Sequence, residues 1–432
     1  MKLAVLLLPA ALLASTVTAQ EPVSIDQALR EARAANARLP IPAYDVAIAQ
    51  DKVEEARAER WLKVAVEGGF IYAPPSGYDP VVTNAGEFRL QAVGRQPLTD
   101  GGARRAAVAR ARADLAAAGG RYRIAEKDLY LGVVTQFNEM LAAREELAAR
   151  RTGIARLESY RTSLKSRQAS GQAVAADLLK TDVRVASDEA SILEAQRRVD
   201  DSRIALNDLM GRSPAAPLEL APPAFPDLAA PSEFRAWDET PEVAEALAEV
   251  RSADAALTIA RAERKPHLDL SADAGFWGSD TSRLVPSELR ALHSDATFAD
   301  RIRRDAGYSF TLSLTWPIFD FGAIRARVAQ ADHALAQAKQ KAEVARRDSY
   351  RQWEQARSAL RALSQEIALL AKAEPVARDA YLEAESRYRG GAASSLEVID
   401  AYAASIEATV RLSEAVSRYR ISRALAERWG TP

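Results

Sequence analysis

PLTDGGARR at residues 97–105 and PIFDFGAIR at residues 317–325 decide the fold, because they are two copies of one pattern. Proline, aspartate, glycine, alanine and arginine recur in register, and each copy leads into a long segment rich in alanine and arginine. Such an internal match indicates a duplicated structural unit. We assign the two copies to residues 20–212 and 241–430, with a proline-rich linker at 213–240.

Two further matches support the duplication. Ser166-Arg167 recurs as Ser386-Arg387 at the same offset, and the segment 57–60 (RAER) recurs at 261–264 at a smaller offset. The three matches occur in the same order in both copies, which is hard to obtain by chance.

Each copy predicts the same order of elements: a helix, two strands, a long helix and a shorter helix. In the first copy we expect these at 24–60 (helix), 61–72 and 87–98 (strands), and 102–167 and 172–210 (helices). In the second copy we expect them at 241–265 (helix), 267–277 and 308–319 (strands), and 322–389 and 393–429 (helices). The predicted fold class is therefore mainly α with β, in two structural repeats.

The four predicted strands alternate apolar and polar side chains with a period of two. In the last strand Tyr308, Phe310 and Leu312 share one face, and serine and threonine residues lie between them. Segments of about ten residues with this pattern are typical of transmembrane β-barrel strands. A soluble antiparallel sheet with one face on a core alternates in the same way, so the strands alone leave both interpretations open.

The number of strands bears on how a barrel could close. The smallest transmembrane barrels have about eight strands, so the four predicted here cannot close one within a single chain. An open sheet edge is not tolerated in lipid, because no water satisfies its backbone groups there. If these strands span a membrane, several chains must pool them, and three chains would supply twelve.

The two long predicted helices, 102–167 and 322–389, would each reach about 100 Å at the helical rise of 1.5 Å per residue. The returning helix of each copy is shorter, and the first helix of a copy could complete it end to end. This arithmetic favours the wall of an elongated tube, with the 213–240 linker as an equatorial element. Gly119-Gly120 interrupts the first long helix, and the sequence leaves open whether the pair marks a bend or close packing.

Residues 1–19 are expected to form a secretory signal peptide, with Lys2 before an apolar run and small residues up to Ala19. The chain contains no cysteine, which excludes disulfides, thiolate metal sites and an acylated N-terminal cysteine. Its formal net charge of -1 gives no electrostatic reason to expect nucleic acid as a partner.

Three segments resemble the TolC family of outer-membrane efflux and secretion proteins: residues 24–29 (SIDQAL), 316–322 (WPIFDFG), and 387–391 (RYRGG) followed by 396–401 (LEVIDA). The resemblance covers nearly all of the chain after the signal peptide. It implies a homotrimer in which a long α-helical coiled-coil tunnel is continuous with a trimeric 12-stranded outer-membrane β-barrel. The protein would lie in the outer membrane of a Gram-negative bacterium, in contact with its lipid, and extend into the periplasm.

The resemblance also implies a function. The chain would be the outer-membrane channel of a tripartite efflux or type I secretion system, a passive conduit from the periplasm to the outside. Its partners would be a periplasmic adaptor protein and an inner-membrane pump. A periplasmic coiled-coil scaffold or adaptor is the alternative, because adaptors share long helical hairpins.

The resemblance places functional residues near the two predicted helical turns. Glu397 and Asp400 would form an acidic ring at the periplasmic aperture, although acidic residues also favour a helix N-terminus for structural reasons. Asp177 and Tyr388 match a gate latch, whose additional basic residue is replaced here by Ala393. The remaining predicted positions are the adaptor-contacting turns, at Gly171, Gly390 and Gly391.

No enzymatic site is predicted. The three histidines, His267, His293 and His333, lack metal-ligand spacing, and no glycine pair belongs to a phosphate-binding loop. No cofactor or metal is therefore expected. The sequence does not indicate the exported substrate or the class of pump.

Overall fold

The computed structural model describes residues 21–72, 86–171, 174–228, 239–279 and 306–429. The predicted signal peptide and part of the proline-rich linker lie outside these residues. The chain divides into two compact units, each made of several segments. The first, the tip unit, comprises Met1–Leu39, Glu126–Phe234 and Gln352–Pro432; the second, the sheet unit, comprises Pro40–Ala125 and Arg235–Arg351.

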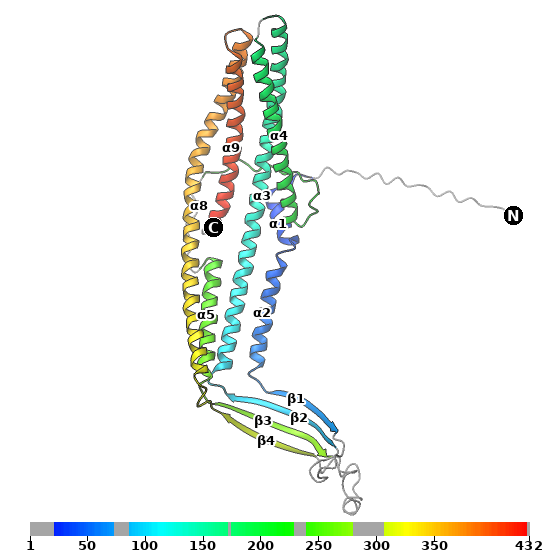
Figure 1. Ribbon diagram of the computed structural model, residues 1–432, viewed down its shortest axis with the longest axis vertical. Helices are drawn as coiled ribbons and strands as arrows, with labels where there is room; N and C mark the ends of the chain where they lie inside the picture. The colour runs from blue at the N-terminus through cyan, green and yellow to red at the C-terminus, as the bar shows by residue number, and fades with distance from the viewer. Residues whose placement is uncertain (1–20, 73–85, 172–173, 229–238, 280–305, 430–432) are drawn as a thin grey trace, which may run out of the picture. The chain divides into compact units, whose positions relative to one another are not determined.

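The described elements repeat in the predicted order, so the mainly α fold class with four strands in two repeats is confirmed (Figure 1). The first repeat contains α1 (Ile25–Ala35), α2 (Pro40–Ala58), β1 (Lys63–Tyr72), β2 (Gly86–Thr99), α3 (Ala103–Ala169) and α4 (Ala175–Leu209). The second contains α5 (Pro241–Ala262), β3 (His267–Ser279), β4 (Ala306–Thr315), α8 (Ala323–Arg389) and α9 (Ser395–Trp429). Apart from two corrections, the predicted boundaries lie within three residues of these.

The first correction concerns the predicted helix 24–60, which is two helices, α1 and α2. The Asn36 side chain accepts a hydrogen bond from the backbone N–H of Leu39 at 3.2 Å and donates one to the Leu209 carbonyl at 2.9 Å. Pro40 then begins α2, at a position where its missing N–H costs nothing. The asparagine turn and the proline together replace the continuous helix.

The second correction concerns the predicted strand 308–319, because β4 ends at Thr315. Pro317 has no backbone N–H and cannot continue a strand ladder. The Trp316 indole instead donates a hydrogen bond to the Arg264 carbonyl at 3.2 Å, at the end of the loop that follows α5. The chain therefore leaves the sheet two residues before the proline.

The quoted repeats form the junctions from strand to long helix. Asp100 accepts a hydrogen bond from the Gly102 N–H at 3.0 Å, and Asp320 accepts one from the Gly322 N–H at the same distance. The other carboxylate oxygen of each aspartate accepts an N–H in the first turn of α3 or α8. Each aspartate therefore caps a long helix in the same way.

The residue after each capping aspartate has a left-handed backbone. Gly101 has φ +69°, and Phe321 has φ +52°. The turn is the same in both repeats although only one copy has glycine at this position.

The four strands form one antiparallel sheet in the order β1-β2-β3-β4 (Figure 1). The central pairing, β2 with β3, joins the two repeats. The register aligns apolar residues across the strands, as in the pairs Leu90 with Phe276 and Leu270 with Leu312. One face is therefore apolar, and many of its side chains are exposed within the chain: Val64, Val66, Leu90, Phe276, Tyr308, Phe310, Leu312 and Leu314.

The opposite face of the sheet is polar. Arg95 donates a hydrogen bond to Glu67 at 3.0 Å, and Ser309 donates one to Asp273 at 2.6 Å. These cross-strand bonds satisfy charged groups on the side away from the apolar residues. The predicted period of two is thus present in the sheet.

Gly120 is explained by close packing within the sheet unit. A Cβ atom at this position would lie 2.8 Å from the Glu245 Cβ and 3.1 Å from its Cα, near the start of α5. A Cβ at Gly119 would meet nothing within 4 Å. Only the second glycine of the pair is therefore required by a neighbouring helix.

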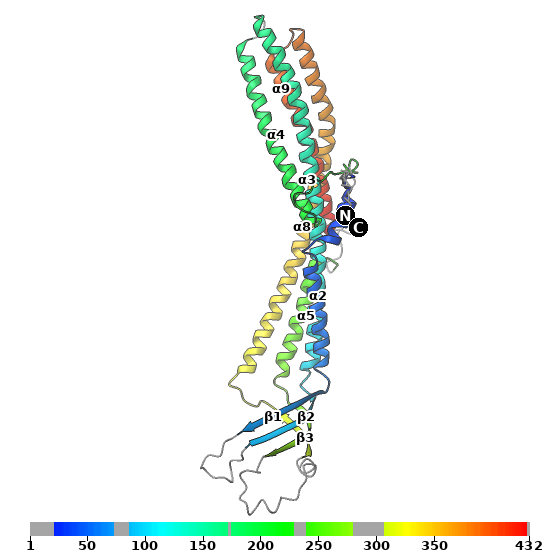
Figure 2. The same ribbon diagram turned by 90° about the vertical axis from the view of Figure 1, so that its right-hand side faces the viewer.

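In the tip unit α3 lies alongside α4, and α8 lies alongside α9 (Figures 1 and 2). One hydrophobic core joins these four helices near the turns that connect them, with Leu157, Tyr160, Leu164, Val185, Tyr381, Tyr388, Val398, Ile399, Tyr402, Ile406 and Val410 buried in it. Within the described residues, none of the helices has a stretch sufficiently long and apolar to span a membrane.

Candidate functional site

The two helical hairpins of the tip unit, α3–α4 and α8–α9, turn at glycines with left-handed backbones. Gly171 has φ +75° and Gly391 has φ +77°. The N–H of Gly391 donates to the Tyr388 carbonyl at 3.0 Å, which closes the end of α8. Gly390 precedes this residue and has no positive φ value, so Gly391 is the glycine that the second turn requires.

Glu397 takes part in a capping box at the start of α9. Its carboxylate accepts the backbone N–H of Ser394 at 3.3 Å, and its own N–H donates to the Ser394 hydroxyl at 3.3 Å. Such a reciprocal pair satisfies two backbone donors that the helix cannot. Asp400 lies one turn further along α9, and both carboxylate residues are exposed within the single chain. Glu397 therefore has a structural role whatever else it does.

Asp177 and Tyr388, the predicted latch, are not hydrogen-bonded to each other within the described part of one chain. Tyr388 is buried, and its ring lies edge-on to Tyr160 with the ring centres 5.1 Å apart. The Arg167 guanidinium lies 4.8 Å from the centre of the Tyr388 ring and donates to the Tyr388 carbonyl at 3.0 Å. The contact of Tyr388 with the first hairpin is thus made through Tyr160 and Arg167.

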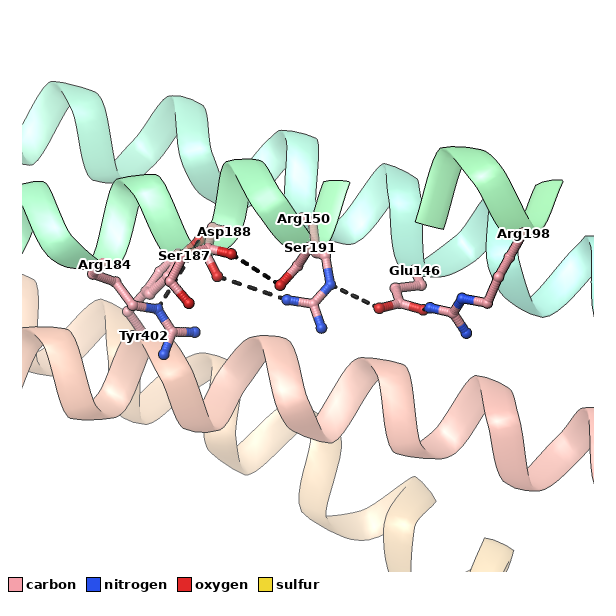
Figure 3. A network of polar contacts seen from close by, with 8 residues as sticks. All are labelled: Glu146, Arg150, Arg184, Ser187, Asp188, Ser191, Arg198 and Tyr402. Carbon is pink, nitrogen blue, oxygen red and sulfur yellow. Dashed lines mark hydrogen bonds and ion pairs between the residues drawn. The ribbon is translucent and has the colours of Figure 1, made fainter. Parts of the chain in front are cut away.

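Asp188 is the centre of a polar network that was not predicted from the sequence (Figure 3). Its side chain is only 2% exposed. It accepts a hydrogen bond from the Tyr402 hydroxyl at 2.9 Å and one from Arg184 at 3.2 Å, and it forms an ion pair with Arg150 at 3.6 Å. The Arg184 guanidinium also lies 5.5 Å from the centre of the Tyr402 ring. Three helices, α3, α4 and α9, therefore meet at one buried carboxylate.

The network extends to a second carboxylate, Glu146 (Figure 3). Arg150 donates to it at 2.8 Å, and Arg198 of α4 donates to its other oxygen. The Glu146 side chain is 5% exposed, so its charge is removed from water and stabilised by these two arginines. Arg150 therefore bridges two buried carboxylates between α3 and α4.

Gly153 provides the space through which Tyr402 reaches Asp188. A Cβ at this position in α3 would lie 2.6 Å from the Tyr402 hydroxyl oxygen and 2.8 Å from the Ile406 Cδ1. The tyrosine side chain therefore rests against bare α3 backbone. A lone glycine inside a helical pattern was the available sequence signal for this packing.

Three tyrosines of the hairpin core, Tyr160, Tyr381 and Tyr402, have raised pKa values, and Tyr160 contacts Tyr388 while Tyr402 contacts Asp188. Burial raises the pKa of Tyr402, and the neighbouring Asp188 carboxylate raises it further. Burial is also the main reason that the pKa of Tyr160 is raised. Both hydroxyls therefore stay protonated at neutral pH, and that of Tyr402 acts as a hydrogen-bond donor to Asp188.

A model of one protein family, described as outer membrane efflux protein, matches residues 28–212 and 235–431. The chain belongs to the outer membrane efflux protein family. The match covers both repeats and confirms the predicted resemblance to the TolC family and the predicted location at the outer membrane. It favours the channel over the alternative of a periplasmic scaffold or adaptor.

Two relatives of this outer membrane efflux protein are the pyoverdine export outer membrane proteins OpmQ of Pseudomonas aeruginosa and Pseudomonas putida. They are 26% and 24% identical to it over 70% of the chain. The chain spans 62% of the length of these curated relatives.

Solved structures of bacterial membrane proteins share the fold of this family member. A membrane protein from Pseudomonas aeruginosa superposes with a TM-score of 0.81 at 20% identity, covering 94% of this chain and 92% of its own. The outer membrane protein VceC of Vibrio cholerae has a TM-score of 0.79 at 18% identity, covering 94% and 96%. In the part of this efflux protein that the structure describes, no group of three or more metal-ligating side chains is placed to hold a metal ion.

Proposed function

We propose that three copies of this chain form an outer-membrane channel through which substrates leave the periplasm. The observation that carries the proposal is the four-stranded sheet with one apolar and one polar face and with β1 and β4 at its edges. Pairing β4 of one copy with β1 of the next would close twelve strands and leave no open edge in lipid. The apolar face would then contact lipid and the polar face would line the channel.

Exposed apolar stripes on the helices support association of copies. On α4, Leu179, Val183 and Leu193 are between 65% and 73% exposed within one chain. On α8, Leu369 and Val376 are 68% and 67% exposed and lie seven residues apart. Apolar residues at such heptad spacing are typical of a helix that packs against another helix. Neighbouring copies of the chain would cover both stripes.

The two turns of the tip unit are proposed as the contact with a periplasmic adaptor protein, which would connect the channel to an inner-membrane pump. Gly171, Gly390 and Gly391 lie at these turns and are exposed. The proposal assigns the chain a passive conduit and no catalysed reaction. The relatives named for pyoverdine export make pyoverdine one cargo to include in a transport assay.

Glu397 and Asp400 are proposed to ring the aperture in the trimer, where they would attract cations. A substitution of Asp400 tests the acidic ring more directly than one of Glu397, because Glu397 also caps α9. We expect Asp400→Asn to reduce block of single-channel conductance by a trivalent cation, with helix content unchanged. Unchanged block would remove the acidic ring from the proposal. The latch between Asp177 and Tyr388 stays a prediction for the assembled gate.

The channel proposal is tested by membrane fractionation and by gel migration of the unheated protein. We expect the full chain in the outer-membrane fraction, migrating as a trimer that heating converts to a monomer. A monomer in the soluble periplasmic fraction would contradict the proposal and favour the scaffold alternative.

A further inference from the structure

We propose that the hydrogen bond from Tyr402 to Asp188 is the positioning contact that holds the acidic start of α9 against the α3–α4 hairpin in the closed channel. The inference rests on the proposed channel function. It assigns Tyr402, Asp188 and Gly153 a role in the opening and closing of the channel, in addition to the residues at the two turns. Opening would require this contact to break.

The position of Tyr402 on α9 supports this role. Asp400 lies two residues before Tyr402, and Glu397 lies five before it, so all three belong to the first eight residues of α9. A bond that fixes the rotation of α9 at Tyr402 also fixes the directions in which the two carboxylates project. Tyr402 therefore acts on the aperture through the helix and does not need to contact the transported substrate.

The geometry makes this contact specific. The Tyr402 side chain is 1% exposed, passes over Gly153 of α3 and ends at Asp188 of α4. The carboxylate that accepts its hydrogen bond is itself held by Arg150 and Arg184, from α3 and α4. The acceptor is thus held by residues of the first hairpin, and the second hairpin supplies the Tyr402 hydroxyl together with the ring over which the Arg184 guanidinium lies.

The hydrogen bond from the Tyr402 hydroxyl to the buried Asp188 carboxylate strongly stabilises the arrangement in which α9 lies against the α3–α4 hairpin. If α9 moved away, Tyr402 would lose a charge-assisted bond, and its hydroxyl would have to find another partner. The two arginines would still neutralise Asp188 after the movement. The α3–α4 hairpin would therefore stay intact while the second hairpin was released, as a gate requires.

The test compares the wild-type trimer with Tyr402→Phe in planar lipid bilayers bathed in potassium chloride. The substitution removes only the hydroxyl and leaves the ring over Gly153. Because hydrogen bonds to charged groups stabilise more than neutral ones, we expect the open probability or mean conductance to rise about tenfold. The melting temperature of the Tyr402→Phe trimer should stay close to that of the wild type.

Tyr381→Phe is the matched control. Tyr381 of α8 is buried in the same core, and its ring lies edge-on to Tyr402 with the centres 5.9 Å apart. No hydrogen bond joins its hydroxyl to another described residue. We therefore expect Tyr381→Phe to conduct like the wild type. Equal increases in both variants would show general loosening of the core and would overturn the proposal.

Gly153→Ala provides a second, independent variant. The added Cβ would lie 2.6 Å from the Tyr402 hydroxyl oxygen and displace it from Asp188 without altering either partner. We expect it to raise conductance as Tyr402→Phe does, and the double variant to add little more. If wild-type trimers conduct and neither substitution changes the conductance, the positioning role is wrong. If wild-type chains form no conducting trimer, the channel function is wrong, and this inference fails with it.

Discussion

The two helical hairpins of the tip unit are equivalent parts of the two repeats, but among the described residues only the first adds buried ion pairs to its apolar packing. Between α3 and α4, an apolar core that includes Phe137, Met140 and Leu206 is accompanied by buried or half-buried ion pairs, among them Arg150 with Asp188 and Arg161 with Asp182 at 2.5 Å. Between α8 and α9, an apolar seam is formed by Ala356, Leu360, Leu363, Ile367, Ala415, Tyr419 and Ala426. The ion pair between α8 and α9 that accompanies this seam, Arg418 with Glu366, is exposed.

The turns of the hairpins differ as well. The second turn leads into α9 through the Ser394–Glu397 capping box. The first leads into α4 at Val174, which has no side-chain capping bond. Directional ion pairs hold helices in one register, whereas an apolar seam tolerates small shifts. We therefore infer that the first hairpin is the fixed frame of the proposed channel and the second the part that moves.

The largest expected effect comes from removing a buried charge in the first hairpin. Glu146→Gln leaves Arg198 without its carboxylate and weakens the hold on Arg150. We expect a loss of about 2–3 kcal/mol in the free energy of unfolding, below the full cost of a buried pair because Arg198 is partly exposed. Urea unfolding followed by circular dichroism measures it.

The matched change in the second hairpin is Glu366→Gln. It removes an exposed ion pair with Arg418, and such pairs contribute about 0.5 kcal/mol or less. Equal destabilisation by Glu146→Gln and Glu366→Gln would show that the two hairpins are held in the same way.

High pH should weaken the contact that Tyr160 and Tyr402 make between the two hairpins. The folded-state pKa values of Tyr160 and Tyr402 are raised, so the stability that their protonated forms contribute is complete below the ordinary tyrosine pKa. It is lost as the pH rises further. We expect the melting temperature of the trimer to fall above about pH 10.

This alkaline loss should be smaller in Tyr402→Phe, which has one fewer group to ionise. Melting curves between pH 7 and pH 11.5 in both proteins test the point. Identical pH profiles would mean that ionisation of Tyr402 is not what destabilises the trimer at high pH.

The next largest effect on stability comes from the capping box at the start of α9. Ser394→Ala removes the hydroxyl that accepts the Glu397 N–H, and the loss of such a cap costs about 1 kcal/mol. The measurement is the melting temperature of the trimer. A variant as stable as the wild type would indicate that the second turn does not depend on its capping box.

The smallest expected effect is a gain in the free energy of unfolding. Val174→Ser would place a capping residue three positions before Asp177 and so create in the first turn the capping box that the second already has. We expect a stabilisation of about 0.5 kcal/mol, measured against Val174→Ala as the control. Destabilisation by the serine would show that the exposed valine has a packing role in the assembly.

The elements of the fold were predictable because their signals are local. Period-two alternation marked the four strands, and the repeated aspartate-glycine junction marked the starts of both long helices. The break between α1 and α2 was missed although Asn36 and Pro40 mark it locally, and only the hydrogen bond from Asn36 to the Leu209 carbonyl is distant in the sequence. The prediction extended the last strand past Pro317 because apolar alternation continued while the backbone could no longer pair.

The candidate site was only partly accessible from the sequence. The capping box at Ser394 and Glu397 is a local pattern that could have been recognised. The bond from Tyr402 to Asp188 joins residues 214 positions apart, and no periodicity reports such a contact. Glu146 and Arg150, four residues apart on a helix, look the same in sequence as an exposed pair. Their burial depends on how α4 packs against α3.

The left-handed residue at the start of each long helix shows how unequally the two copies can diverge after duplication. At Gly101 an added Cβ would collide with the Lys265 side chain at 2.8 Å, so that copy must keep glycine. Phe321 is 94% exposed, and its ring contacts that of Phe319 at an interplanar angle of 60°, with ring centres 4.6 Å apart. Its copy therefore tolerates a large aromatic residue on the same backbone. A comparison by residue identity counts Gly101 and Phe321 as a mismatch, although they have the same backbone conformation. Searches for further duplications should therefore score the capping aspartate and the backbone conformation.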